Sequence, residues 1–102
     1  MSFRFPSADI FCRVIDNFGD AGVCWRLACR LKSLGIAVRF ITDRPDVLEL
    51  IAPHAAEEAL IAAWDDFAKA AAQPGFQPSE LIIETFGCRL PEAYDEAAAK
   101  LR

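Results

Sequence analysis

The sequence of 102 residues is poor in side chains that bind metal ions. It has one histidine, His54, and four cysteines, none of them in C-x-x-C spacing: Cys12, Cys24, Cys29 and Cys88. A structural zinc site needs four clustered cysteine or histidine ligands, so we expect no such site. We expect the cysteines to be buried free thiols in a reducing compartment, and His54 to lie on the surface.

Basic residues and long apolar runs are scarce as well. Eleven Lys and Arg stand against 15 Asp and Glu, giving a net charge of -4. Nucleic-acid-binding proteins neutralise phosphates with clustered Lys and Arg, so we expect no nucleic-acid partner. No apolar run approaches the ~20 residues of a membrane-spanning helix, and the first residues lack the apolar core of a signal peptide. We therefore expect a cytoplasmic protein with no membrane partner.

The chain is rich in apolar residues, which make up 54% of it and are enough for the core of one small domain. Short apolar runs of strand length alternate with stretches of helical periodicity. The pattern predicts strands over 9–15, 37–41, 60–64 and 81–85, with helices over 22–34, 45–51, 66–72 and 92–101. This alternation favours an α/β fold with a Rossmann-like parallel sheet.

One part of this pattern is ambiguous. Residues 55–72 are rich in alanine, which favours helix. The order of the elements nevertheless calls for an edge strand before the third helix, and the strand over 60–64 is placed on that ground. Gly35 is expected to end the first helix as its C′ residue.

The segment between the first predicted strand and helix carries the most chemistry. Residues 16–22 read Asp-Asn-Phe-Gly-Asp-Ala-Gly, with the carboxylates Asp16 and Asp20 four residues apart. Ligands of parallel α/β sheets bind at the carboxyl ends of strands, beside the amino ends of helices. Carboxylates there can bind a cation, orient hydroxyls or take a proton. The structural alternative is that they cap the helix and form an ordinary turn.

The glycines of this segment form neither a dinucleotide-binding motif nor a P-loop. Gly19 and Gly22 give G-x-x-G in place of G-x-G-x-x-G, and no Gly-Lys-Ser/Thr follows. Asp20 would also lie against a pyrophosphate and repel it. Asp43 stands about twenty residues further on, where a ribose-binding acid would be. A dinucleotide-binding oxidoreductase domain therefore stays as an alternative.

Two stretches of the sequence resemble a known family. Residues 9–28, DIFCRVIDNFGDAGVCWRLA, and 81–92, LIIETFGCRLPE, are similar to the opening of the bacterial elongation factor P arginine rhamnosyltransferases. The spacing between the two stretches is similar as well. The alanine-rich middle, residues 52–75, matches poorly and carries no functional residue over.

This resemblance implies a fold and an activity. The family's enzymes have the GT-B fold, in which two Rossmann-like domains face a cleft. They transfer rhamnose from dTDP-β-L-rhamnose to an arginine of translation elongation factor P, with inversion and without a metal or other cofactor. Residues 1–102 would be the N-terminal part of the first, acceptor-side domain. The nucleotide-sugar-binding domain would lie outside this sequence, so we expect this part alone to be inactive.

The resemblance also implies roles for individual residues. Asp20 falls on the general base and Asp16 on its partner carboxylate. Asn17, Phe18 and Gly19 fall, with Asp20, on the loop that contacts the donor sugar. The chemistry suits these residue types, because a carboxylate can bind the cationic, poorly nucleophilic guanidinium and accept its proton.

Three further residues have less specific interpretations. Trp25 is expected to pack in the core rather than to stack on a nucleotide base. Glu84 either lines the site or bonds loop amides, and Arg89 is a candidate contact for an acidic partner. The alternative to an enzyme is a non-catalytic fragment that only docks elongation factor P.

Overall fold

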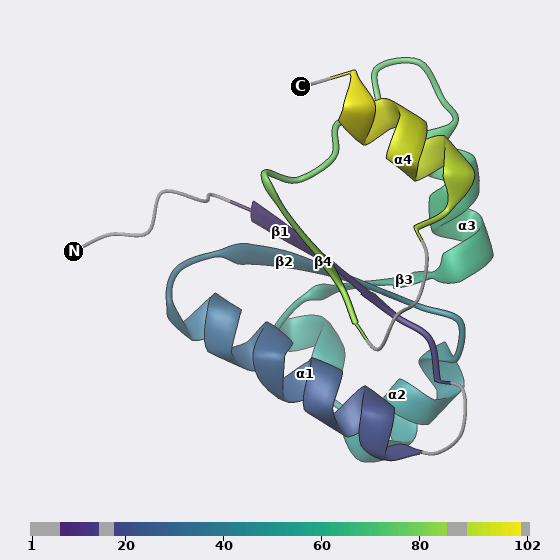
Figure 1. Cartoon of the computed structure of the whole chain (residues 1–102). Helices are drawn as coiled ribbons and strands as arrows, with labels where there is room; N and C mark the ends of the chain where they lie inside the picture. Colours follow the sequence, from purple (N-terminus) through teal and green to yellow (C-terminus); the bar gives the residue numbers. More distant parts are fainter. Residues whose placement is uncertain (1–6, 15–17, 86–89, 101–102) are drawn as a thin grey trace.

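The computed structural model describes residues 7–14, 18–85 and 90–100. Within them, four parallel strands form one sheet in the order β3-β2-β1-β4: β1 (Ser7–Cys12), β2 (Ala37–Thr42), β3 (Leu60–Ala63) and β4 (Leu81–Glu84). The helices are α1 (Phe18–Ser33), α2 (Pro45–Ile51), α3 (Trp64–Ala71), α4 (Glu92–Ala99) and the short 3-10 helix η1 (Ala55–Glu57). The predicted α/β fold with a Rossmann-like parallel sheet is confirmed (Figure 1). None of the helices in these ranges is long and apolar enough to cross a membrane.

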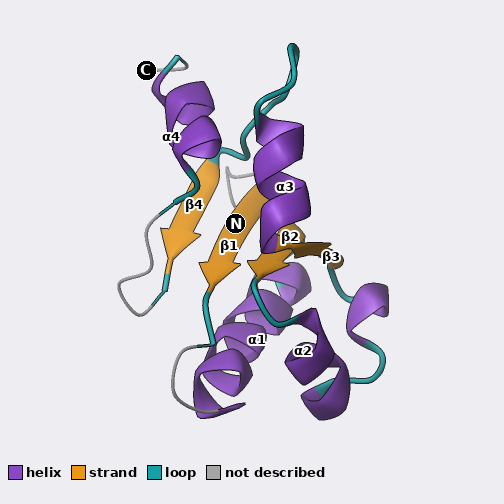
Figure 2. Ribbon diagram, turned by 90° about the vertical axis from the view of Figure 1, so that its right-hand side faces the viewer, coloured by secondary structure: helices purple, strands orange, loops and turns teal. Residues whose placement is uncertain are grey.

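Helices cover both faces of the sheet. Figures 1 and 2 show α1 and α2 on one face and α3 and α4 on the other. Successive residues of a strand point to opposite faces, so the middle strand contributes to two cores. Ile10 packs in one core with Leu48 of α2, and Phe11 packs in the other with Phe67 of α3 and Tyr94 of α4.

The strand order reverses at β1. The chain runs from β1 through α1 to β2 and through α2 to β3, and then returns through α3 to β4 on the other side of β1. The carboxyl ends of β1 and β4 therefore lie side by side, with Phe11 paired to Glu84. In open parallel sheets this reversal is where ligands bind.

The start of α1 corrects a sequence prediction. The helix begins at Phe18 in place of Gly22, so most of the predicted glycine loop is helical. The space around Gly22 does not require a glycine, because a Cβ added there would have no atom of the described residues within 4 Å. Asp20 in the first turn favours the early start, because the positive end of the helix dipole attracts its charge. This attraction offsets part of the ~1 kcal/mol that each helical glycine costs.

The carboxyl end of β1 is also earlier than predicted. The strand ends at Cys12, which pairs with Thr42, the last residue of β2. Arg13 and Val14 follow outside the strand, since β2 extends no further to pair with them. The remaining residue of the predicted strand, Ile15, lies outside the described residues.

The other predicted elements agree with the structure to within a few residues. The helix over 45–51 is observed as predicted, and the ambiguous stretch contains both the strand β3 and the helix α3. Gly35 follows α1 with φ 87°, and the Ile36 N–H donates to the Leu31 carbonyl at 3.1 Å. These are the features of a glycine C′ residue, as expected.

A buried carboxylate joins the sheet to α4. Asp9 of β1 is 0% exposed and accepts hydrogen bonds from Arg39 Nε at 2.6 Å and Nη2 at 2.7 Å. The Ser79 backbone N–H and hydroxyl donate to it at 2.9 and 2.7 Å, and the Tyr94 hydroxyl donates as well. These donors come from β2, from the segment before β4 and from α4. Asp9 therefore holds together three parts of the chain that are distant in sequence.

The negative charge of Asp9 is balanced by the Arg39 guanidinium and by the hydrogen bonds from Ser79 and Tyr94. Burial alone would raise the pKa of Asp9, but the hydrogen bonds from Arg39, Tyr94 and Ser79 outweigh it and lower that pKa below its usual value. Arg39 also donates to the Gln77 carbonyl at 2.9 Å. The buried carboxylate is thus stable as an anion.

We predict that Asp9→Asn strongly destabilises the fold. The substitution removes the anionic partner of Arg39 and places an amide group among hydrogen-bond donors. Breaking a buried ion pair on one side typically costs about 3–5 kcal/mol. Urea unfolding should show a clearly lower midpoint. Asp46→Asn is the matched control, because it breaks the exposed Arg44–Asp46 pair at 2.9 Å and should change little. Equal, small effects of both substitutions would contradict the prediction.

The stabilisation by Asp9 should also depend on pH. Because the pKa of Asp9 is lowered on folding, the unfolded chain binds its proton more readily. The stability that Asp9 contributes is complete above the unfolded pKa of about 3.9 and is lost as the pH falls through the folded value. The difference in unfolding free energy between wild type and Asp9→Asn should therefore shrink below about pH 4. A difference that stays constant down to the acid limit of the unfolding titration would refute this.

Candidate functional site

The candidate site lies where the strand order reverses, at the carboxyl ends of β1 and β4. The first turn of α1 begins there and contains Asp20, which is partly exposed. Gly19, just before it, is exposed. At the end of β1 the Cys12 Sγ lies 4.0 Å from the carbonyl oxygen of Asp20. The structure thus places Asp20 at the end of the sheet where the sequence predicted a site.

The other predicted site residues are only partly described. Phe18 is the first residue of α1, followed by Gly19, so both lie in the same turn as Asp20. Asp16 and Asn17 lie outside the described residues. Their predicted roles beside Asp20 stay predictions.

The position of Asp20 bears on its structural alternative. Because α1 begins at Phe18, Asp20 is inside the first turn and is not the N-cap residue. Its structural contribution is then the attraction of its charge to the helix dipole, worth about 0.3–1 kcal/mol. A partly exposed carboxylate in this place is accessible to a cationic ligand.

Two thiols and a hydroxyl near the start of α1 connect three elements. The Cys24 thiol of α1 donates to Thr85 Oγ1 at 3.1 Å, and the Thr85 hydroxyl donates to the Phe11 carbonyl of β1 at 2.7 Å. The Thr85 backbone N–H reaches the same carbonyl at 3.1 Å. The end of β1, the residue after β4 and the second turn of α1 are therefore linked one helical turn after Asp20.

The cysteines of this cluster are buried. A hydrogen bond with Cys12 lowers the pKa of the Cys24 thiol to about 7, and burial opposes this shift. Cys12 and Cys24 are buried, as predicted, and Cys29 is only partly buried. Cys88 lies outside the described residues. Buried thiols are shielded from reagents, so this cluster is suited to packing and hydrogen bonding rather than to nucleophilic chemistry.

Asp43 lies at the same edge of the sheet, directly after β2. Its Oδ1 accepts the backbone N–H of Val14 at 2.9 Å. This bond ties the segment after β1 to the end of β2. Asp43 therefore has a local structural role, which weakens its interpretation as a ribose-binding acid.

The structure tests some of the predictions for Trp25, Glu84 and Arg89. Trp25 packs edge-on against Phe40 at 5.5 Å between ring centroids, so its predicted core role is confirmed. Glu84 is exposed, and its register with Phe11 places it on the face of the sheet that α3 and α4 cover. Arg89 lies outside the described residues.

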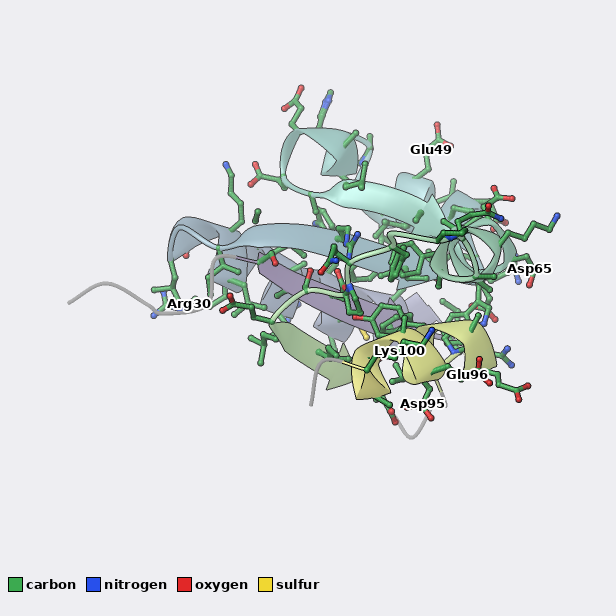
Figure 3. All side chains as sticks on the ribbon, turned by 90° about the horizontal axis from the view of Figure 1, so that it is seen from above. Arg30, Glu49, Asp65, Asp95, Glu96 and Lys100 are labelled. Atoms are coloured by element: carbon green, nitrogen blue, oxygen red, sulfur yellow. The ribbon has the colours of Figure 1, made fainter. Side chains whose placement is uncertain are left out.

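Other charged groups of the described residues form exposed pairs rather than a second site. Among the residues that the structure describes, no group of three or more His, Cys, Asp or Glu could hold a metal ion. The side chain of His54 is 83% exposed, as expected for a surface histidine. Figure 3 shows Glu49, Asp65 and Asp95 pointing outward from their helices. The carboxylate of Asp20 is therefore the acidic group best placed for chemistry in the described chain.

Sequence reasoning missed the contacts that support Asp20. The sequence pattern predicts Thr85 only as the end of a strand and Cys24 only as a buried thiol. The two residues are 61 positions apart, and no spacing rule connects residues so distant in sequence. The one available signal was the polar Thr85 at the end of an apolar strand on the candidate side of the sheet.

Comparison with known proteins gives a consistent result. Residues 8–102 match a family described as Elongation-Factor P (EF-P) rhamnosyltransferase EarP. A protein-arginine rhamnosyltransferase of Pseudomonas aeruginosa is 41% identical over 95 residues, which cover 89% of this chain and 25% of the relative. Proteins of the same name are 37% identical in Pseudomonas putida, over 87% of this chain and 25% of the relative, and 40% identical in Neisseria meningitidis serogroup B, over 81% and 23%.

Two facts follow from these matches. The chain spans about a quarter of the length of the curated relatives it matches. The family match extends over nearly all of the chain, from residue 8 to residue 102, and agrees with the resemblance in the two motif stretches. The chain therefore belongs to the EarP family of elongation factor P rhamnosyltransferases.

Proposed function

We propose that residues 1–102 are the N-terminal part of the acceptor-side domain of a GT-B protein-arginine rhamnosyltransferase. The enzyme transfers rhamnose from dTDP-β-L-rhamnose to an arginine of translation elongation factor P in the cytoplasm, with inversion. The observation that carries this proposal is the partly exposed carboxylate of Asp20 in the first turn of α1, at the reversal of strand order. The names of the relatives support it.

In this reaction Asp20 binds the acceptor guanidinium and accepts a proton from it. A guanidinium is cationic and its lone pairs are delocalised, so it attacks a sugar poorly. A carboxylate can bind it and direct one nitrogen at the anomeric carbon. As the nitrogen–carbon bond forms, the bond from that carbon to the diphosphate oxygen breaks, and Asp20 accepts the proton from nitrogen. Attack on the face opposite the leaving diphosphate inverts the anomeric centre.

The other predicted residues complete this proposal. Asp16 is the partner carboxylate, and Asn17, Phe18 and Gly19 contact the donor sugar with Asp20. Carboxylates repel a diphosphate, so the nucleotide end of the donor is bound elsewhere. We place it in a C-terminal domain outside this sequence, which agrees with the share of the relatives that the chain covers.

A docking module is the second candidate function. A chain limited to one Rossmann-like unit would bind elongation factor P without transferring sugar. The coding sequence beyond Arg102 distinguishes the two. A continuous reading frame with a second Rossmann-like half supports the enzyme, and a stop codon supports the docking module.

We predict that Asp20→Asn in the full-length enzyme lowers the transfer rate by ~10²-fold or more, the usual range for loss of a general base. The melting temperature should barely change, because Asn keeps the size and only the attraction of ~0.3–1 kcal/mol to the helix dipole is lost. Intact mass of elongation factor P after reaction measures transfer, and thermal unfolding measures stability.

Asp95→Asn is the matched control for this experiment. Asp95 is an exposed aspartate in the first turn of α4, so its substitution removes the same charge from a similar helical position on the opposite face of the sheet from α1 (Figure 2). It should leave transfer unchanged. Full activity of Asp20→Asn would remove the assignment of the base and leave Asp16 as the candidate.

We also predict that the 102-residue chain alone binds dTDP-β-L-rhamnose too weakly to detect. Its loop contacts only the sugar end, and a few hydrogen bonds of ~1 kcal/mol each cannot offset the cost of association. Calorimetry on the isolated chain tests this, with the full-length enzyme as the positive control. Micromolar binding by the isolated chain would show that the diphosphate site lies within these residues.

A further inference from the structure

The hydroxyl of Thr85 has a function that its backbone does not supply. The Thr85 backbone N–H already bonds the Phe11 carbonyl at 3.1 Å, which is enough to continue the pairing of β4 with β1. The hydroxyl donates to the same carbonyl at 2.7 Å and accepts the Cys24 thiol at 3.1 Å. It therefore links the end of β1 to helix α1, a contact that strand pairing alone would not make.

The helical partner of Thr85 is well placed to control Asp20. Cys24 follows Asp20 by four residues, so the two side chains lie on the same face of α1, one turn apart. Cys24 is 1% exposed, and its bond to Thr85 joins α1 to the residue that follows β4. The Cys12 Sγ adds a second, weaker contact at the Asp20 carbonyl, 4.0 Å away.

We propose that Thr85 is a positioning residue for rhamnose transfer: its hydroxyl, acting through Cys24, holds the first turns of α1 so that the Asp20 carboxylate stays at the carboxyl end of β1. This inference rests on the proposed function. Thr85 acts through Cys24, whereas the base itself is Asp20. Catalytic rates are sensitive to such placement, since a shift of ~1 Å at a reacting group can cost ~10²-fold.

The test compares Thr85→Val with Thr85→Ser in the full-length enzyme. Valine has the shape of threonine and keeps the backbone N–H, but it can neither accept from Cys24 nor donate to Phe11. Serine keeps the hydroxyl. We expect Thr85→Val to lower kcat about tenfold with little change in KM for the donor, and Thr85→Ser to stay near wild type. The pH profile of kcat should keep its limits, because the base is unchanged.

A double substitution tests the route through Cys24. If Thr85 acts through the thiol, Cys24→Ala should reproduce most of the loss, and combining it with Thr85→Val should add little. Equal kcat for the Val and Ser variants would overturn the proposal. The proposal would also be overturned if Thr85→Val lowered both kcat and the melting temperature while Cys24→Ala left kcat unchanged.

A second measurement does not depend on rhamnose transfer. Amide hydrogen exchange should be faster in the first turns of α1 in Thr85→Val than in Thr85→Ser, while amides of α4 serve as the unchanged reference. Identical exchange in the two variants would overturn the link from Thr85 to α1, whatever the enzyme does. A wild-type enzyme without transfer activity, combined with faster exchange in Thr85→Val, would instead refute the proposed function and support the link.

Discussion

The buried carboxylate of Asp9 constrains the whole sheet. It lies on the middle strand, and its donors Arg39, Ser79 and Tyr94 come from a neighbouring strand, a loop and the last helix. An anion without water is stable only if several donors reach it together. The segment before β4 and helix α4 must therefore take these positions for the chain to fold. This single requirement fixes how the second half of the chain docks onto the first.

That constraint extends to the opposite end of the strands. Asp9 pairs in register with Ile82 of β4, and the same register pairs Phe11 with Glu84. Thr85 follows at once and so reaches both the Phe11 carbonyl and Cys24. The hydrogen bonds at Asp9 and those at Thr85 therefore both depend on the same register between β1 and β4. The first set keeps β4 against β1, and the second uses that alignment to hold α1.

The sequence predicted the order of elements well because apolar periodicity is local. α2 was predicted to the residue, and the parallel sheet followed from the alternation of strand and helix. Local patterns were less informative at Gly19 and Gly22, where glycine indicated a loop and the charge of Asp20 at the helix start favours helix instead. The bond from Arg39 to Asp9 joins residues 30 positions apart, and the bond from Cys24 to Thr85 joins residues 61 apart. Such pairs depend on sheet register, which the sequence pattern alone does not give.

The two aspartates show how environment separates a structural carboxylate from one available for chemistry. Asp9 is fully buried and accepts bonds from three side chains and a backbone amide, so no ligand can reach it. Asp20 is partly exposed at a helix start. Helix N-termini favour negative charge, so the first turn of α1 is a favourable place for a carboxylate. A cationic acceptor needs a carboxylate of this second kind. The Cys12 contact is made to the Asp20 backbone carbonyl and the Thr85 contact to Cys24, so neither uses the carboxylate oxygens that the proposed function assigns to the guanidinium.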